Sequence, residues 1–516
     1  MKKFATLLGI LVFALSLYGQ QRILVRASQA QLEAAGVTKS ESVIPNWRMF
    51  TAVDTTVMKE LRAKGLYAEV DYEAQLYDNG NSAASSQNPL QWWITASNRM
   101  WNGDFRDAWV ITKGDVRVKV GILDTGSPRN HGVWTHPGLD SSRFIVGPSF
   151  MDQGTTVDSD LVNTDYAGHS THIAGIIGGK ENDSVGISGV DNRCRIEFYK
   201  CFSMFGVGYY SAIANAIYRA AEDSCKILNM SFGGIFYSRL LEDAMKYATN
   251  RGVLCVVAAG NFGDETQSFP AFFGKFSTDP TYTGGLPGII SVGSINPNGR
   301  VSWFSNYGYF VDVYAPGGAG NLPADAEDIL STWPLYLAQD TTAKLPRGYH
   351  YLAGTSMAAP MIVGTASLML AVNPKLTPAQ LQKMICSSAD TLMTVNGPVL
   401  VLNPGQAVRN ARDSGGVISA VQDKKSAVPE EFGLSQNYPN PFNPMTVIRY
   451  QVSGYSHVTL DIYNVLGQKV ATLVNEEKPA GSYSVTFNAS DLPSGMYIYK
   501  LQAGSFVETK KMILLK

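Results

Sequence analysis

The sequence is poor in charged residues, histidine and cysteine, and these shortages exclude several classes of function. Charged residues make up 16% of the 516 positions and nearly cancel, leaving a formal net charge of −1. No cluster of lysine and arginine stands out, so we expect neither nucleic acid nor an anionic membrane surface as a partner. The six histidines and five cysteines include no CxxC motif of the zinc or redox type. The 45% of apolar residues is enough for about three globular domains.

Long apolar runs are also absent, except at the N-terminus. Residues 1–20 place Lys2 and Lys3 before an apolar stretch from Phe4 to Tyr18, which then gives way to polar residues. That stretch is short for a membrane span and is typical of a cleaved secretory signal peptide. No other stretch approaches spanning length, so we expect export and no transmembrane anchor in the mature form.

Five cysteines allow at most two disulfides. Cys194 and Cys225 each precede an apolar, strand-like run, so one arrangement joins them below a sheet. Five buried thiols are an equally weighted alternative, because a free cysteine behaves as a small apolar residue. The spacing leaves this choice open.

Composition divides the rest of the chain into parts. Residues 22–77 predict a small α+β unit, in which a helix from about Thr55 to Lys64 separates two strands. Residues 78–89 have the polar composition of a flexible linker. In residues 90–412, apolar runs of strand length alternate with helix-length segments, which indicates a parallel sheet covered by helices on both faces. Functional sites of such folds form at the carboxyl ends of the strands.

The C-terminal part has a different pattern. A second linker, residues 413–431, precedes segments in which apolar and polar residues alternate, such as VTLDIYNV and SYSVTF, broken by glycine-containing turns. Residues 432–516 therefore predict a small antiparallel β-sandwich.

Four motifs place polar groups at the ends of predicted strands and helices. They are GILDTG with Asp124, GHSTHIAG with His169, AAGN with Asn261, and GTSMAAP with Ser356. Each has a structural alternative: Ser356 as a helix cap, Asp124 and Asn261 as turn residues. His169 and His172 have the spacing of half a metal site, but no third ligand cluster accompanies them.

Taken together and in this order, the motifs resemble those of the subtilisin-like serine proteases, the subtilases, over roughly residues 88–412. The stretches THPGL, NMSFGG and PKLTPAQLQKMI extend the resemblance. It implies that Ser356 is the nucleophile, His169 the general base and then acid, and Asp124 the group that orients the imidazole. The amide of Asn261 and the helix beginning at Ser356 would stabilise the oxyanion.

The resemblance also places a substrate along NMSFGG and VAAGN as an added strand. No charge is evident in these segments, so we expect a broad pocket that prefers apolar or aromatic side chains. Two positions depart from the family pattern: Ser170 stands where glycine usually follows the base histidine, and Met361 where a histidine is common. Neither departure removes a catalytic atom. The residues expected to border the first specificity pocket are Ser231, Gly233, Ala258 and Gly260.

Both flanking parts have resemblances of their own. Residues 22–77 resemble the inhibitory propeptide of the family, with autocleavage expected in the stretch 77–90. The C-terminal phrases YPNPFNP and LPSGMYIYKL resemble the sorting domains of type IX secretion. The implied partners are protein or peptide substrates, the chain's own propeptide and the secretion machinery. The implied location is secreted or at the cell surface, reached through the periplasm, with release and surface attachment both open.

The sequence thus predicts an α/β fold: a subtilisin-like three-layer domain with a parallel sheet, preceded by a small α+β propeptide and followed by a β-sandwich. The expected activity is that of a serine endopeptidase acting through an acyl-enzyme. The alternative is a catalytically inactive surface adhesin on the same fold, whereas an esterase would need a GxSxG elbow. Catalysis requires no cofactor in this scheme. The resemblance also suggests structural calcium, for which no complete ligand pattern is readable among the loop acids Asp152, Asp158 and Asp160.

Overall fold

The structure of the chain is a computed structural model that divides into two compact units, Met1–Gly416 and Val417–Lys516. The predicted signal peptide (1–20), the linker at 78–89, almost all of the linker at 413–431 and the acids Asp152, Asp158 and Asp160 lie outside the described residues. The structure describes residues 21–52, 55–77, 91–94, 104–151, 163–181, 187–275, 285–320, 326–337, 345, 347–394, 397–414, 432–434, 436–437, 440, 442, 445–478, 481–489, 492–504 and 506–515.

The N-terminal module, residues 21–77, is built on a four-stranded antiparallel sheet. The predicted helix is observed as α3 (Thr56–Ala63), whereas α2 (Gln29–Ala34) was not predicted. α2 begins with a capping box, in which the side chains of Ser28 and Gln31 each accept from the other's backbone N–H. The strands lie in the order β2 (Glu41–Ser42), β3 (Trp47–Ala52), β1 (Gln21–Arg26) and β4 (Tyr67–Val70).

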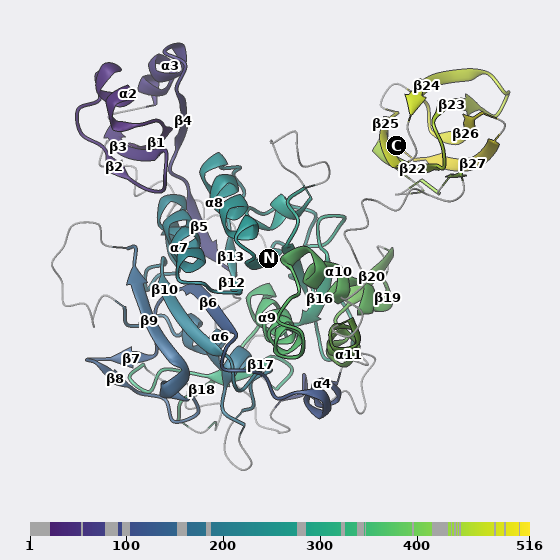
Figure 1. Ribbon diagram of the computed structural model, residues 1–516. Coiled ribbons are helices and arrows are strands. Elements are labelled where there is room, and N and C mark those ends of the chain that lie inside the picture. Colours follow the sequence, from purple (N-terminus) through teal and green to yellow (C-terminus); the bar gives the residue numbers. More distant parts are fainter. Residues whose placement is uncertain are drawn as a thin grey trace, which may run out of the picture. The chain divides into compact units, whose positions relative to one another are not determined.

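The two faces of this small sheet bury different partners. Ile23 and Val25 of β1 belong to the apolar cluster that includes residues of α2 and α3. Leu24, between them, belongs instead to the cluster of α7 (Tyr210–Glu222) and α8 (Arg239–Asn250). Side chains alternate across a strand, so β1 holds its own helices on one face and the main module on the other. Figure 1 shows the N-terminal module above α7 and α8.

A nine-stranded sheet organises the main α/β module. Eight neighbouring strands run parallel, and β19 (Asp390–Thr394) joins the edge as an antiparallel hairpin partner of β20. The order is β19, β20 (Gly397–Val401), β16 (Val313–Pro316), β15 (Ile289–Ile295), β14 (Leu254–Ala258), β12 (Ile227–Met230), β6 (Lys119–Asp124), β10 (Arg195–Lys200) and β9 (Phe144–Ser149).

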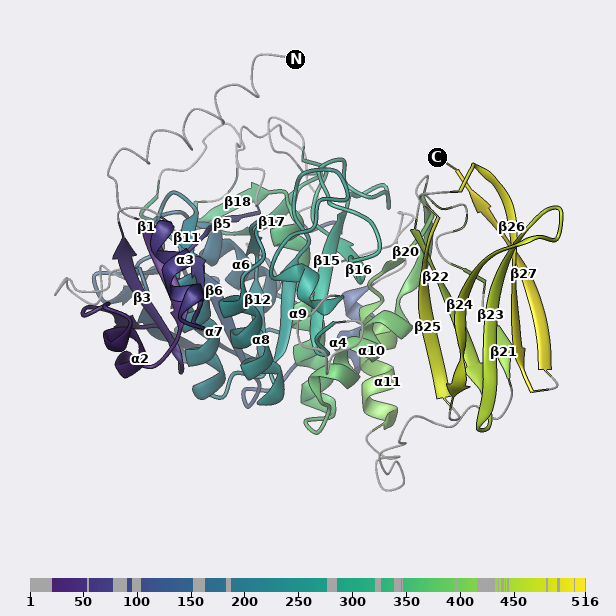
Figure 2. The same ribbon diagram turned by 90° about the horizontal axis from the view of Figure 1, so that it is seen from above.

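Helices cover both faces of this sheet, as the sequence predicts. One apolar cluster joins Val256 of β14 to residues of α6 and α9, and the other joins Val257 to residues of α7 and α8. Adjacent residues of one strand thus enter different cores, which makes three layers (Figure 2). The first face carries α4 (Phe105–Ile111), α6 (His169–Gly178), α9 (Thr355–Val372), α10 (Pro378–Ser388) and α11 (Pro404–Ser414).

The cysteines occupy both of these cores. Cys194 belongs to the cluster with α6 and α9, and Cys225 to the cluster with α7 and α8. The sheet separates them, so the pairing considered from sequence is wrong and both thiols are free. The remaining free thiols are Cys201, Cys255 and Cys386.

One helix of the described residues, α9, is long and apolar enough to cross a membrane. From the sequence, we expected no stretch of spanning length beyond the N-terminal apolar run. Its 18-residue window is 89% buried within the protein, and its residues from Thr355 to Leu370 are all buried. α9 is therefore the central core helix of the module.

The C-terminal module consists of two antiparallel sheets that share one apolar core. Large side chains such as Tyr450, Tyr499 and Phe487 are buried between the strands. This agrees with the predicted β-sandwich. One sheet contains β21 (Gly433–Leu434), β22 (Met445–Val452) and β25 (Gly481–Asn488); the other contains β24 (Lys469–Lys478), β23 (Ser456–Asn464), β26 (Gly495–Ala503) and β27 (Phe506–Leu514).

Candidate active site

A buried carboxylate and an imidazole meet at the carboxyl edge of the main sheet. Asp124 is the last residue of β6, and His169 is the first residue of α6. Their contact runs from Nδ1 of His169 to Oδ1 and Oδ2 of Asp124, at 2.9 and 2.8 Å. Asp124 is fully buried and His169 is 1% exposed, so water does not compete for this contact. A carboxylate held in this way fixes the tautomer of the ring, leaving Nε2 to exchange protons.

A second buried acid holds the start of α6. Asp165 accepts hydrogen bonds from the N–H groups of Gly168 (2.8 Å) and Thr171 (2.8 Å), which are orphan donors of a helix N-terminus. Its Oδ1 also accepts from Thr125 Oγ1 at 2.7 Å, and the Thr125 N–H donates to Asp124. Burial raises the pKa of Asp165, with the charge of Asp124 acting in the same direction. Thr125 and Asp165 therefore join the strand end to the helix start.

Ser356 lies in the first turn of α9, which begins one residue earlier than predicted. The N-cap is Gly354, which has no side chain, so the capping role considered for Ser356 is wrong. Ser356 Oγ donates to the backbone carbonyl of Ser231 at 2.8 Å. In return, Ser231 Oγ donates to the carbonyl of Ser356 at 2.8 Å. That carbonyl lacks its usual helical donor because Pro360, four residues on, has no N–H.

Asn261 follows β14 and faces the same helix start. Its Oδ1 accepts from the Thr355 N–H at 3.0 Å and from Thr355 Oγ1 at 2.8 Å. Its Nδ2 is buried and has no hydrogen-bond partner among the described residues. The amide is thus anchored through its oxygen and presents its N–H groups as unused donors.

A segment of the N-terminal module lies across these residues as a strand. β5 (Glu73–Leu76) pairs antiparallel with β13 (Phe232–Gly233) on one side and with β11 (Val207–Tyr209) on the other. Figure 1 shows β5 leaving the small sheet and entering the main module beside β13. This segment occupies the edge where the sequence analysis placed a substrate.

Tyr77, directly after β5, contacts the predicted nucleophile and one predicted pocket residue through its backbone. Its N–H donates to the Ser231 carbonyl at 3.2 Å, and its own carbonyl oxygen accepts from the Ser356 N–H at 3.2 Å. The carbonyl oxygen of Tyr77 is therefore held at the N-terminus of α9.

The four residues predicted to border the pocket are placed differently. Ser231 and Gly233 contact the β5 segment directly, through the hydrogen bond to Tyr77 and through strand pairing. Ala258 is buried in the apolar cluster that also includes Tyr77. Gly260 has φ +113° and donates its N–H to Thr355 Oγ1 at 3.3 Å. A side chain at Gly260 would collide with Asn306, whose Nδ2 lies 2.4 Å from the Cβ position.

The remaining histidine of the motif has a structural role. His172 Nε2 lies 3.0 and 3.1 Å from the carbonyls of Ile329 and His350, which belong to β17 (Ile329–Thr332) and β18 (Tyr349–Leu352). Burial lowers the pKa of His172, so the ring stays neutral and donates to these carbonyls. Within the described ranges, no group of three or more histidine, cysteine or acidic side chains is arranged to hold a metal ion.

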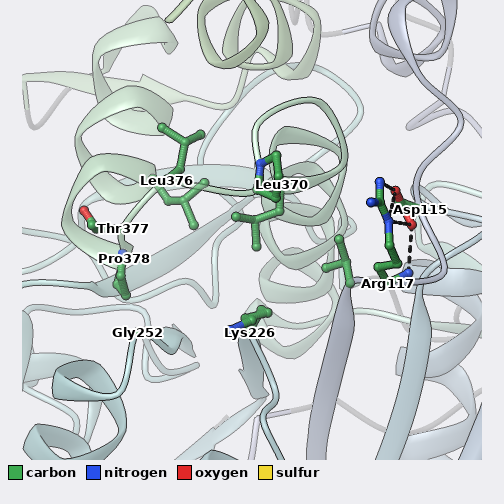
Figure 3. Close-up of a pocket in the computed structure, with 11 residues that line it drawn as sticks. Asp115, Arg117, Lys226, Gly252, Leu370, Leu376, Thr377 and Pro378 are labelled. Atoms are coloured by element: carbon green, nitrogen blue, oxygen red, sulfur yellow. Dashed lines mark hydrogen bonds and ion pairs between the residues drawn. The ribbon is translucent and has the colours of Figure 1, made fainter. Parts of the chain in front are cut away.

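A cavity of about 270 Å³ lies elsewhere and is not the site described above. Val118 and Lys226, which line it, directly precede β6 and β12, and Gly252 lies shortly before β14 (Figure 3). The cavity is therefore at the amino ends of the strands, whereas Asp124 and Asn261 lie at the carboxyl ends of β6 and β14. Chemistry in parallel sheets is found at the carboxyl ends.

Sequence reasoning missed three residues that complete the site. Tyr77 is the last residue before the polar linker, and that position was the available signal. Thr125 and Asp165 stand beside predicted residues, but only their hydrogen bonds reveal a role.

Comparison with known proteins gives two family matches. Residues 115–432 match the model of the subtilase family, and residues 436–515 match the model of a secretion system C-terminal sorting domain. The chain is 33% identical to thermitase of Thermoactinomyces vulgaris over 262 residues, which are 51% of this chain and 77% of thermitase. It is 31% identical to subtilisin DY of Bacillus licheniformis over 276 residues, 53% of this chain and 84% of that protein.

Two further relatives extend the comparison. The chain is 34% identical to a thermophilic serine proteinase of Bacillus sp. (strain AK1) over 262 residues, 51% of this chain and about half (54%) of that protein. Among solved structures, a protease from Pseudoalteromonas arctica superposes with a TM-score of 0.51 at 26% identity, covering 62% of this chain and 96% of that one.

Proposed function

Because the chain belongs to the subtilase family, we propose that it is a serine endopeptidase that cleaves peptide bonds through an acyl-enzyme on Ser356. The observation that carries the proposal is the position of Tyr77, whose carbonyl oxygen accepts from the Ser356 N–H. A peptide carbonyl held against the backbone of a helix-start serine is arranged for nucleophilic attack. The C-terminal sorting domain gives the chain a secreted or cell-surface location.

The proposed mechanism assigns one role to each of three side chains. As Ser356 Oγ attacks the carbonyl carbon, His169 Nε2 takes the hydroxyl proton and later gives it to the leaving amine. Asp124, hydrogen-bonded to Nδ1 at 2.8 Å, stabilises the imidazolium that forms between these steps. Water then attacks the acyl-enzyme by the same route in reverse.

Two donors stabilise the oxyanion. One is the Ser356 N–H, which already binds the Tyr77 carbonyl oxygen. The second is Nδ2 of Asn261, which is buried and has no hydrogen-bond partner among the described residues, while the amide oxygen accepts from Thr355. Both donors sit at the positive end of α9, so the charge developing on the carbonyl oxygen is favoured.

The N-terminal module acts in this scheme as an inhibitory propeptide that blocks the cleft until it is cut. Its β5 strand fills the edge between β11 and β13, so a substrate is excluded while it remains. The contacts of Tyr77 narrow the expected autocleavage, which the sequence placed in the stretch 77–90, to the bond between Tyr77 and Asp78.

Labelling with a fluorophosphonate probe tests the activity. The processed chain is expected to be labelled, and Ser356→Ala is expected to lose all labelling. Ser387→Ala, which removes an exposed serine of α10, serves as the matched control and should label normally. Casein hydrolysis should follow the same pattern. If folded, processed wild-type protein fails to label, the proposal is wrong and an inactive binding protein on the same fold takes its place.

A further inference from the structure

The side chain of Tyr77 is enclosed by the main module. It is 5% exposed, although it belongs to a segment that leads into a linker. The ring of Phe262 meets it edge-on, with centroids 6.2 Å apart and planes at 77°. On the other side lies Gly233, where a Cβ would stand 2.7 Å from Tyr77 Cε2. The enclosure therefore contacts the ring through Phe262 and depends on the absence of a side chain at Gly233.

The far end of this enclosure carries a single polar group. Ser268 is fully buried, and its Oγ lies 2.6 Å from the hydroxyl oxygen of Tyr77. Its backbone is fixed, because its carbonyl accepts from the Phe272 N–H at 2.8 Å at the start of η2 (Ala271–Gly274). Among the described residues, no other hydrogen bond to the Ser268 hydroxyl is found.

The electrostatics match a neutral phenol. Burial raises the pKa of Tyr77, and the hydrogen bond with Ser268 acts in the opposite direction; no charged side chain contributes. The hydroxyl therefore stays protonated at neutral pH and exchanges one hydrogen bond with Ser268. Among the described residues, no carboxylate acts on the Tyr77 hydroxyl, so a lysine or arginine would find no opposite charge in that part of the structure.

We propose that Ser268 is a specificity-determining residue that makes the protease prefer tyrosine to phenylalanine on the acyl side of the cleaved bond. This inference rests on the proposed function, because Tyr77 then stands for the corresponding residue of a substrate. A phenylalanine would fill the same enclosure but leave the buried Ser268 hydroxyl without its partner. A site built around one substrate hydroxyl discriminates against the analogue that lacks it.

The size of the preference follows from one neutral hydrogen bond. Such a bond contributes about 1 kcal/mol net, so we expect roughly a five- to tenfold higher kcat/KM for tyrosine than for phenylalanine. We expect this ratio of kcat/KM to be smaller than a fully sealed pocket would give, because Phe262 is itself 54% exposed and water can enter at that side.

Peptide substrates that differ only at this residue test the inference. The wild type is expected to show the five- to tenfold ratio, and Ser268→Ala to bring the two rates within twofold of each other. Gln267→Ala is the control, because this neighbour is exposed and its side chain bonds to Tyr309 instead. Its ratio should equal that of the wild type. A wild-type ratio below twofold, or an unchanged ratio in Ser268→Ala, overturns the inference.

A binding measurement separates this inference from the catalytic one. In the uncut Ser356→Ala chain, Tyr77→Phe and Ser268→Ala are combined in a double-mutant cycle and thermal midpoints are recorded. We expect the two substitutions to be coupled, so that each one lowers the midpoint less when the other is present. If the changes in thermal midpoint caused by the two substitutions are additive, the inference is overturned even if the protease is active. If the cycle shows coupling but the processed wild-type protein fails to label with the fluorophosphonate, the pocket is supported and only the proposed function is refuted.

Discussion

Asp71 links the N-terminal module to the main α/β module, and its replacement by alanine is expected to weaken the proposed inhibition strongly. The carboxylate is 4% exposed and accepts from the N–H and Oγ of Ser211, at 2.9 and 2.6 Å. Ser211 is the second residue of α7, whose own N-cap makes no side-chain hydrogen bond. Arg22 completes the contact at 2.9 Å. The N-terminal module thus supplies the missing cap of a helix of the main module.

The magnitude follows from these contacts. A side-chain cap is worth about 1 kcal/mol and a hydrogen bond to a charged group about 1.5–3 kcal/mol. Burial raises the pKa of Asp71, so desolvation offsets part of this gain. We therefore expect Asp71→Ala to cost about 2–3 kcal/mol, which is a roughly 30- to 150-fold rise in the inhibition constant.

The assay adds the excised propeptide, residues 21–77, to the processed enzyme and measures the inhibition constant. Asp71→Asn keeps an acceptor oxygen for Ser211 and avoids burying a charge, so it should lose less than half as much binding energy as Asp71→Ala. Glu60→Ala, which removes an exposed carboxylate of α3, should inhibit like the wild type. If Asp71→Ala inhibits within threefold of the wild type while remaining folded by circular dichroism, the capping argument is refuted.

Three further predictions follow from the active site and its support. Asn261→Ala should lower kcat by about 10²–10³ with little change in KM, because it removes a donor used in the transition state. Steady-state kinetics on one peptide measures both constants. A rise in KM as large as the fall in kcat would contradict this role. Ser356→Ala should accumulate the uncut precursor, whereas N-terminal sequencing of the active wild type should begin at Asp78; a mature N-terminus near residue 20 would count against the propeptide assignment. Burial lowers the pKa of His136 from 6.5 to about 4, so its contribution to stability is complete above pH 6.5 and is lost as the pH falls towards 4. The thermal midpoint should therefore fall as the pH is lowered over this window in the wild type, and it should fall less in His136→Gln. If the midpoints of both proteins fall equally with pH, His136 is not the cause.

The candidate catalytic residues could be named from the sequence because their signals are local. Asp124 ends a buried apolar strand and Asn261 follows another, while His169 and Ser356 lie in the first turns of apolar helices, so each polar group interrupts an otherwise apolar segment. The parallel sheet then brings all four to one edge, since the carboxyl ends of its strands coincide there. The role of His172 was less predictable, because its carbonyl partners come from β17 and β18, far along the chain.

The residues around the bound segment could not be predicted, because each depends on a pairing between distant parts of the chain. Nothing in the local sequence places Ser268 at the end of the Tyr77 ring or Asp71 at the N-terminus of α7. The cysteines show the same limit: the spacing of Cys194 and Cys225 permits a disulfide, and only the sheet between them excludes it.

The sequence by itself determined the family and predicted the order of the modules and the catalytic residues, because those depend on short patterns of strand ends, helix starts and glycine turns. The tertiary structure alone decided which atoms meet. It laid β5 between β11 and β13, set the Tyr77 carbonyl on the Ser356 N–H and enclosed the Tyr77 side chain against Ser268. These contacts arise from backbone pairing and burial across long sequence separations, which no local pattern encodes.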